Sequence, residues 1–288
     1  MPGNHSGSLD VNRRGFLKAS TLLAGATALG FSGMFGLRSA SAAAGDDPIT
    51  ILNVAATAET FACTHYYSAL KSNIVWTQAQ LDYIRSALEQ ELIHLEFLNT
   101  NGGNTLAKEF YFPTGVFNSR TSFGTVSAIA ETVFVGAYLA ATRRFAELGN
   151  SLLAATAAQV AVIEGQHLAL VRQTALELPN NLPLAEPSFY NVSDAVPVVK
   201  PLLDGKEGAL GKMDSKTVAY PGADVIRKLI GKSLQSPVKA FVDPTLFPNE
   251  AAIPAATMSA TESAPSAPTA QPTEQPTPAA TAAATTAQ

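Results

Sequence analysis

Residues 77–103 read TQAQLDYIRSALEQELIHLEFLNTNGG, and this stretch has the signals of one complete α-helix. Thr77 and Gln80 form a capping box, in which each side chain can bond to the backbone N–H of the other residue. Leu, Ile and Ala then recur at steps of three and four residues, and Gly102 with Gly103 ends the pattern. Because an apolar face of this length must be buried against other elements, the stretch predicts a bundle of helices.

Three further segments carry helical signals. Asp47 is a suitable N-cap, Pro48 suits the first helical position, and helical spacing of apolar residues continues to position 71. A third helix is expected over about 119–149 and a fourth over 151–178. The junctions within the first pair and within the second pair are short, so each pair is antiparallel. About 17 residues, rich in aromatic side chains, separate the second helix from the third. We therefore predict an all-α four-helix bundle with one long crossover between helices 2 and 3.

The two halves of this bundle also resemble each other, as after an internal duplication. Shifts of 72 or 73 residues align Glu59 with Glu131, Tyr66 with Tyr138, Glu91 with Glu164 and His94 with His167.

Two Glu-x-x-His motifs stand out, Glu91 to His94 and Glu164 to His167. A step of three residues is close to one helical turn, so the two side chains of each motif leave the same face of their helix. His65 is the only other histidine beyond position 44. It lies six residues after Glu59, about 240° around the helix, and is not expected to join a site with it.

Glu59 and Glu131 lie in the apolar stripes of the first and third helices, as Glu91 and Glu164 do in the second and fourth. A buried carboxylate costs several kcal/mol unless it is paired, protonated or bound to a metal, and no Lys or Arg lies on these stripes. Two divalent cations would supply four positive charges against the four carboxylates. The site is balanced only with metal bound or with some of the glutamates protonated.

One Glu from each of two helices and Glu-x-x-His from each of the other two resembles the dinuclear carboxylate site of ferritin-like proteins. The chain looks most like exported bacterial ferritin-like proteins that are related to plant desiccation-related proteins. This resemblance implies two iron ions, or two manganese ions as the alternative, because oxygen-rich ligands with imidazole suit these metals. It also implies roles for the six residues. Bridging carboxylates are assigned to Glu91 and Glu164, terminal carboxylates to Glu59 and Glu131, and terminal nitrogens to His94 and His167.

The other polar residues of the bundle receive structural interpretations. Tyr66 and Tyr138 are expected in the core with hydrogen-bonded hydroxyls, with a redox role as the alternative, and Cys63 is expected as a small buried side chain. The glutamates off the apolar stripes are expected at the solvated surface, namely Glu89, Glu96, Glu109 and Glu147.

Residues 1–44 resemble a twin-arginine signal peptide. Arg13 and Arg14 precede Gly-Phe-Leu-Lys and a weakly apolar stretch, and small residues at 40–44 offer cleavage sites. This resemblance implies passage through the twin-arginine translocase and a periplasmic or other extracytoplasmic location. A retained membrane anchor is the alternative for this segment. No stable membrane span is expected after cleavage.

The remaining segments complete the predicted domain organisation. Residues 45–178 should form the bundle. Residues 179–250 should be an extension that packs on it, with short helices near 193–203 and 224–234. Residues 251–288 are rich in Ala, Thr and Pro, contain no Lys or Arg, and should be disordered.

Charge and cysteine content exclude several classes of function. Removing residues 1–42 leaves 15 basic and 22 acidic residues, a net charge of −7, and no basic cluster remains to neutralise nucleic-acid phosphates. A single Cys excludes an internal disulfide framework and a thiolate metal cage.

We expect an exported protein that performs redox chemistry with dioxygen or hydrogen peroxide, ferroxidase-like or catalase-like. The alternative is a non-enzymatic, metal-binding protein of the desiccation or stress response.

Overall fold

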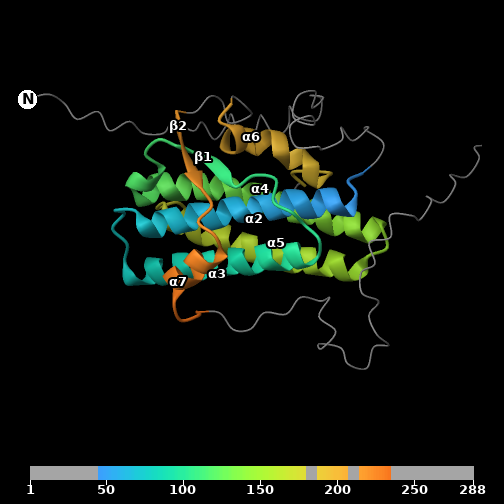
Figure 1. Ribbon diagram of the computed structural model, residues 1–288, viewed down its shortest axis with the longest axis horizontal. Coiled ribbons are helices and arrows are strands. Elements are labelled where there is room, and N and C mark those ends of the chain that lie inside the picture. The colour runs from blue at the N-terminus through green and yellow to red at the C-terminus, as the bar shows by residue number, and fades with distance from the viewer. Residues whose placement is uncertain (1–44, 180–186, 207–213, 235–288) are drawn as a thin grey trace, which may run out of the picture. The chain divides into compact units, whose positions relative to one another are not determined.

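A computed structural model describes residues 45–179, 187–206 and 214–234 of the chain. Four long helices form the bundle (Figure 1), namely α2 (Pro48–Lys71), α3 (Gln78–Thr100), α4 (Arg120–Glu147) and α5 (Ser151–Thr174). α2 packs on α3 and α4 packs on α5, so the bundle consists of two helical hairpins joined by a crossover. The predicted all-α four-helix bundle with one long crossover between its second and third helices is confirmed.

The helix ends follow from local chemistry. The Asp47 side chain accepts a hydrogen bond from the Thr50 N–H at 2.7 Å and caps α2. The predicted capping box of Thr77 and Gln80 is present at the start of α3. After α3, Gly103 passes so close to α2 that a Cβ there would lie 2.9 Å from the Leu52 carbonyl oxygen. Only glycine allows the chain to leave the helix this close to its neighbour.

The crossover contains a strand that the sequence patterns did not predict. β1 (Glu109–Pro113) pairs antiparallel with β2 (Ser215–Ala219), with Phe110 opposite Val218. Phe110 and Phe112 are buried against the bundle. Each strand is five residues long and its partner lies about a hundred residues away, so neither has a strong local pattern.

An aromatic cluster lies beneath this strand and includes His65. The His65 ring stacks on Phe112 and Phe123, and its Nε2 lies 2.8 Å from the Ser127 hydroxyl oxygen. Burial lowers the pKa of His65 to about 3, so the ring is neutral. His65 is thus a core residue away from the other two histidines of the bundle, as its helical position predicts.

The described parts of the C-terminal extension pack on the bundle. They contain η3 (Val192–Ala195), followed by α6 (Val196–Asp204), and further on α7 (Ala223–Ile230). In the crossover itself, η2 (Val116–Asn118) leads into α4. α6 lies beside β1, and α7 lies on α3 (Figure 1). These helices correspond to the short helices predicted near 193–203 and 224–234.

Two surface glutamates of α3 contact the C-terminal extension. Glu96 pairs with Arg227 of α7. Glu89 accepts hydrogen bonds from the Ser233 hydroxyl and, at 2.9 Å, from the Leu234 N–H. Both residues thus lie at the surface, as expected, and make contacts there with the extension.

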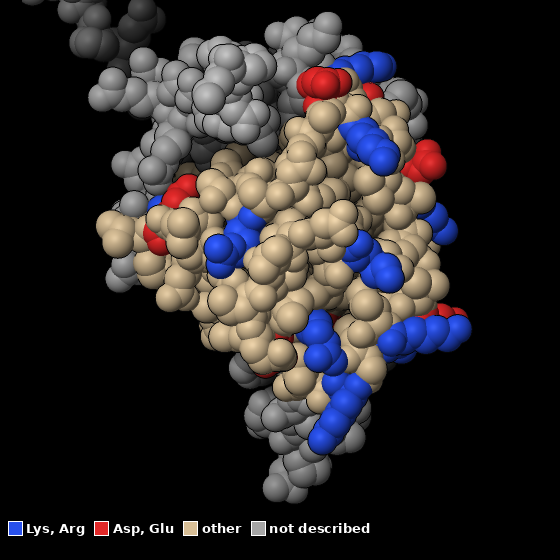
Figure 2. Space-filling view, turned by 90° about the vertical axis from the view of Figure 1, so that its left-hand side faces the viewer, with Lys and Arg blue, Asp and Glu red and all other residues tan. Residues whose placement is uncertain are grey.

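Of the helices in the described residues, α4 has the length and apolar composition that a membrane span would require. However, 72% of its most apolar stretch of 18 residues is buried inside the protein. The position of α4 in the bundle explains this apolar composition. Figure 2 shows one face of the molecule, on which Lys and Arg side chains are dispersed over a largely uncharged surface. The predicted signal peptide with Arg13 and Arg14, and the predicted tail over 251–288, lie outside the described residues.

Candidate metal centre

All six candidate ligands lie in the interior of the bundle. α2 contributes Glu59, α4 contributes Glu131, and the other two helices contribute one Glu-x-x-His motif each. His94 is 9% exposed and the other five residues are at most 1% exposed. Helical spacing places each Glu and its His on one interior face, so the two motifs approach each other from α3 and α5.

The two Glu-x-x-His motifs interlock. His94 Nδ1 lies 3.5 Å from Glu91 Oε2 and 3.2 Å from Glu164 Oε1. His167 Nδ1 lies 3.0 Å from Glu91 Oε1 and 3.1 Å from Glu164 Oε2. Each of these two glutamates therefore turns one oxygen to each histidine, which is the placement required of a carboxylate that bridges two ions.

The other two glutamates stand at opposite ends of the cluster. Glu59 Oε2 lies 3.6 Å from His94 Nδ1, and Glu131 Oε2 lies 3.9 Å from His167 Nδ1. Two groups of possible metal ligands result, each with its ligand atoms within 4.8 Å of one another. One group contains Glu59, Glu91, His94 and Glu164, and the other contains Glu91, Glu131, Glu164 and His167.

The donor atoms fit divalent ions. Such ions bind N and O at about 2.0–2.2 Å, so neighbouring ligand atoms of one ion stand roughly 3 Å apart. Six buried polar atoms of the cluster have no hydrogen-bond partner, namely Glu59 Oε2, both oxygens of Glu91, His94 Nδ1, Glu131 Oε2 and Glu164 Oε1. Unpaired buried polar atoms are costly, and these converge on one point. A donor set of four carboxylates and two imidazoles suits iron or manganese better than a closed tetrahedral zinc site.

Without cations, the electrostatics of the cluster favour the protonated forms of several of its glutamate and histidine side chains. Burial raises the pKa of Glu59 well above its usual range, and the neighbouring Glu164 and Glu91 raise it further. Burial and then Glu91 raise the pKa of Glu131 in the same way. Burial also works to raise the pKa of Glu91, but the adjacent histidines outweigh it and leave that pKa below its usual value.

The histidines respond to the same carboxylates. Burial opposes their protonation, yet Glu59 raises the pKa of His94 and Glu91 raises the pKa of His167, both well above the usual value. Cations in the cluster would replace these protons as the source of positive charge.

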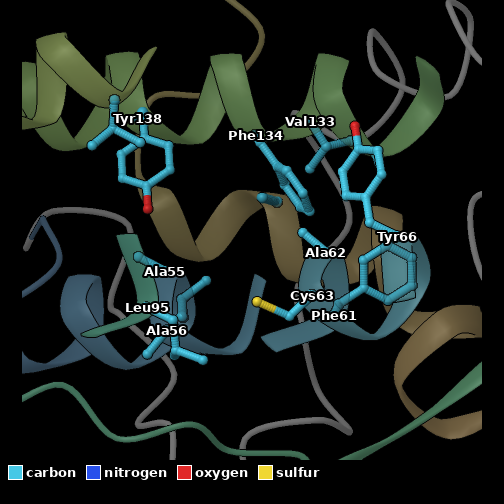
Figure 3. Close-up of a cluster of buried hydrophobic side chains, with 14 of the residues drawn as sticks. Ala55, Ala56, Phe61, Ala62, Cys63, Tyr66, Leu95, Val133, Phe134 and Tyr138 are labelled. Atoms are coloured by element: carbon cyan, nitrogen blue, oxygen red, sulfur yellow. The ribbon is translucent and has the colours of Figure 1, made fainter. Parts of the chain in front are cut away.

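Two tyrosines form a reciprocal pair of hydrogen bonds with Glu131 and Glu59. Tyr66 of α2 donates a 2.6 Å hydrogen bond to Glu131 of α4, and Tyr138 of α4 donates one to Glu59 of α2. Figure 3 shows the two rings pointing in opposite directions across the gap between these helices. Burial raises the pKa of both hydroxyls, so they remain donors. The predicted core role with a hydrogen-bonded hydroxyl matches this arrangement.

The patterns did not single out Gln90. Its Oε1 lies 2.7 Å from His167 Nε2, so the ring donates that N–H to the amide and presents Nδ1 to the cluster. The 73-residue shift aligns Gln90 with Ile163, which cannot accept such a bond. The only sequence signal was a polar residue next to Glu91, and a contact between α3 and α5 was needed to interpret it.

Cys63 is fully buried in the core, and burial followed by the charge of Glu91 raises its thiol pKa. It belongs to neither group of possible metal ligands, as expected of a small buried side chain.

Comparison with known proteins agrees with this geometry. Searches of curated proteins and of solved structures found no match to the chain. A scan of protein families matched residues 47–177 to the family described as Ferritin-like domain. The matched range runs from the N-cap of α2 to just past the end of α5, and so takes in all four bundle helices and the whole cluster. Residues 47–177 are thus similar in sequence to ferritin-like domains, and the four-helix bundle agrees with that similarity.

Proposed function

We propose that this protein binds two iron ions, or two manganese ions as the alternative, and uses them for redox chemistry with dioxygen or hydrogen peroxide. The observation that carries the proposal is the position of Glu91 and Glu164, each of which turns one oxygen to His94 and the other to His167. A site for a single ion would not require the two oxygens of each carboxylate to face different histidines.

The chain's own residues would hold and insulate the pair. Glu59 with His94 and Glu131 with His167 would complete the two sites, and Glu91 with Glu164 would bridge them. Tyr66 and Tyr138 orient the terminal carboxylates, and Gln90 orients one imidazole. When bound, a pair of such ions supplies two-electron exchange with dioxygen or peroxide. The buried setting excludes bulk water, which strengthens every charge interaction in the site.

The first experiment is elemental analysis of the protein purified from its native compartment and of the metal-free protein reloaded anaerobically. We expect two ions per chain. Glu91→Ala and His167→Ala should bind fewer ions, whereas Glu147→Ala, a surface change on α4, should keep both. One ion per chain in the wild-type protein would contradict the dinuclear site.

Activity is then measured on the metal-loaded protein. Ferrous oxidation by dioxygen indicates a ferroxidase-like function, and disproportionation of peroxide by the manganese form indicates a catalase-like function. Loss of either activity in Glu91→Ala and His167→Ala, with retention in Glu147→Ala, assigns it to the cluster.

The alternative is a non-enzymatic, desiccation- or stress-related role. It is supported by the distribution of the six candidate ligands over the helices of the bundle. Because the six side chains come from all four bundle helices, bound metal would tie the helices together and stabilise the fold by mass action. Full metal occupancy with no turnover in the assays above would support this role.

We also propose that residues 1–44 direct export by the twin-arginine translocase, as in exported bacterial ferritin-like proteins. The support is the Arg13-Arg14 motif and the small residues before Gly45. In the native host, Arg13→Lys with Arg14→Lys should retain the uncleaved precursor in the cytoplasm. N-terminal sequencing of the exported wild-type protein should place its start near residue 44. An unprocessed wild-type protein held in the membrane would contradict cleavage.

A further inference from the structure

Two apolar cavities lie within the described residues close to the metal-binding cluster. The outer cavity, of about 60 Å³, lies between α2, α4 and the segment formed by η3 and α6. The inner cavity, of about 20 Å³, lies among the four bundle helices, and His94 forms part of its wall.

The lining of the outer cavity offers no hydrogen bond to an occupant. Among the described residues that line it, Thr57 and Tyr138 are the two with polar side chains. The Thr57 hydroxyl donates to the Asn53 carbonyl and accepts from the Leu106 N–H, and the Tyr138 hydroxyl donates to Glu59. An apolar lining of this kind favours xenon or small hydrocarbons over water, which would find no hydrogen-bond partner there.

The two cavities share three wall residues, Ala55, Tyr138 and Ala141. Two of these have only a methyl group as side chain, so the Tyr138 ring is the one bulky group of the shared wall. Figure 3 shows this ring extending from α4 toward α2 in the region of Ala55. The inner cavity then reaches His94, whose side chain is 10% exposed while that of Glu59 beside it is fully buried.

The size and polarity of the outer cavity select its occupant. One water needs roughly 10–15 Å³ of such volume, so the cavity has room for a diatomic molecule. Hydrogen peroxide would lose its hydrogen bonds to water on entry and regain none. Dioxygen has none to lose and gains dispersion contacts with the lining.

We propose that the outer cavity binds dioxygen and that dioxygen reaches the metal-binding cluster past Tyr138, on the side of His94. This inference rests on the proposed function and narrows it to a site supplied with dioxygen by an apolar route. It also assigns a purpose to the extension, because η3 and α6 form one wall of the cavity.

The first test uses xenon and does not depend on metal. Crystals of the wild-type protein held under xenon pressure should show xenon in the outer cavity. Val199→Phe fills the cavity from α6, and Ala137→Leu fills it from α4, so xenon should be absent from both variants. Val162→Phe, on the exposed face of α5, should retain it. The two filling variants lie on different elements, so misfolding of one leaves the other informative. An empty outer cavity in the wild-type protein overturns the proposal.

The second test measures oxidation of the ferrous-loaded full chain in a stopped-flow instrument, after confirming wild-type metal content in each variant. Both filling variants should raise the dioxygen concentration for half-maximal rate several-fold, while oxidation by hydrogen peroxide stays within the range of the Val162→Phe control. Equal slowing with both oxidants, or no slowing with either, overturns the route. If the wild-type protein oxidises ferrous ion with neither oxidant, the proposed function fails, and the xenon result still decides whether the cavity binds an apolar molecule.

Discussion

Gln90 is the residue that makes the two halves of the cluster unequal. It fixes the His167 ring, whereas the equivalent position in the other half is Ile163. His94 is also the more exposed of the two histidines. The ion held by His167 should therefore be bound more tightly than the ion held by His94, because its ligand is already oriented.

Replacing Gln90 tests this inequality. Gln90→Leu removes the acceptor for His167 Nε2 and should weaken binding at one of the two sites by about 10- to 100-fold. Gln166→Leu, an exposed change next to His167, should leave both affinities unchanged. Titration against a competing chelator measures the two constants. Wild-type affinities in Gln90→Leu would show that the hydrogen bond does not orient the ligand.

Protonation of the same residues makes the stability of the metal-free protein depend on pH. The pKa values of Glu59, Glu131, His94 and His167 are raised in the folded protein, so the fold binds more protons than the unfolded chain. Their contribution is complete below the unfolded values, about 4.3 for Glu and 6.5 for His, and is lost as pH rises through the raised values. The lowered pKa of Glu91 acts in the opposite sense and matters only in strong acid.

Thermal unfolding of the metal-free protein should therefore give a Tm that falls between about pH 5 and pH 8. Metal affinity should rise over the same interval, since binding displaces the retained protons. Unfolding scans and metal titrations at matched ionic strength measure both trends. A metal-free Tm that increases with pH would contradict the assigned protonation.

Among the elements, α2 and α4 are linked by their exchange of tyrosine hydrogen bonds, and α7 is attached from outside. α7 lies on α3, its Ile226 and Ile230 side chains are both buried, and its Arg227 pairs with Glu96 of α3. Exposed ion pairs contribute at most about 1 kcal/mol, whereas truncating a buried Ile to Ala costs about 2–5 kcal/mol. Burial should therefore dominate the attachment.

Hydrogen exchange of residues 223–230 distinguishes the two contributions. Ile226→Ala should release α7 and speed exchange across it, because the lost burial exceeds what the ion pair supplies. Glu96→Ala should change that exchange little. Exchange in the buried turns of α3 should remain slow in both variants. Comparable release by Glu96→Ala would show that the ion pair holds the helix.

For the whole molecule, metal should act as a structural crosslink as well as a reactive group. Each of two ions present at 100 times its dissociation constant stabilises a fold by about 2.7 kcal/mol, so chelation of both should lower Tm by roughly 10–20 °C. Glu147→Gln, a surface change, should show the same decrease in Tm on chelation as the wild-type protein, as measured by calorimetry. Glu91→Gln should show little or none, since it removes a bridging ligand while keeping the side-chain volume. A wild-type Tm that does not respond to chelation would contradict metal binding in the cluster.

The sequence by itself determined the four helices and the interior positions of the six candidate ligands. Caps such as Thr77 with Gln80, and the spacing of Glu91 and His94, are local features with a period that one helix imposes on its own residues. Only the tertiary structure decided which carboxylate oxygen faces which histidine, the contact of Gln90 with His167, the pairing of β1 with β2, and the cavities beside Tyr138. The reason is physical, because these features depend on how each helix is rotated and set against partners remote in the chain. The packing of the whole core determines that arrangement, and no local pattern encodes it.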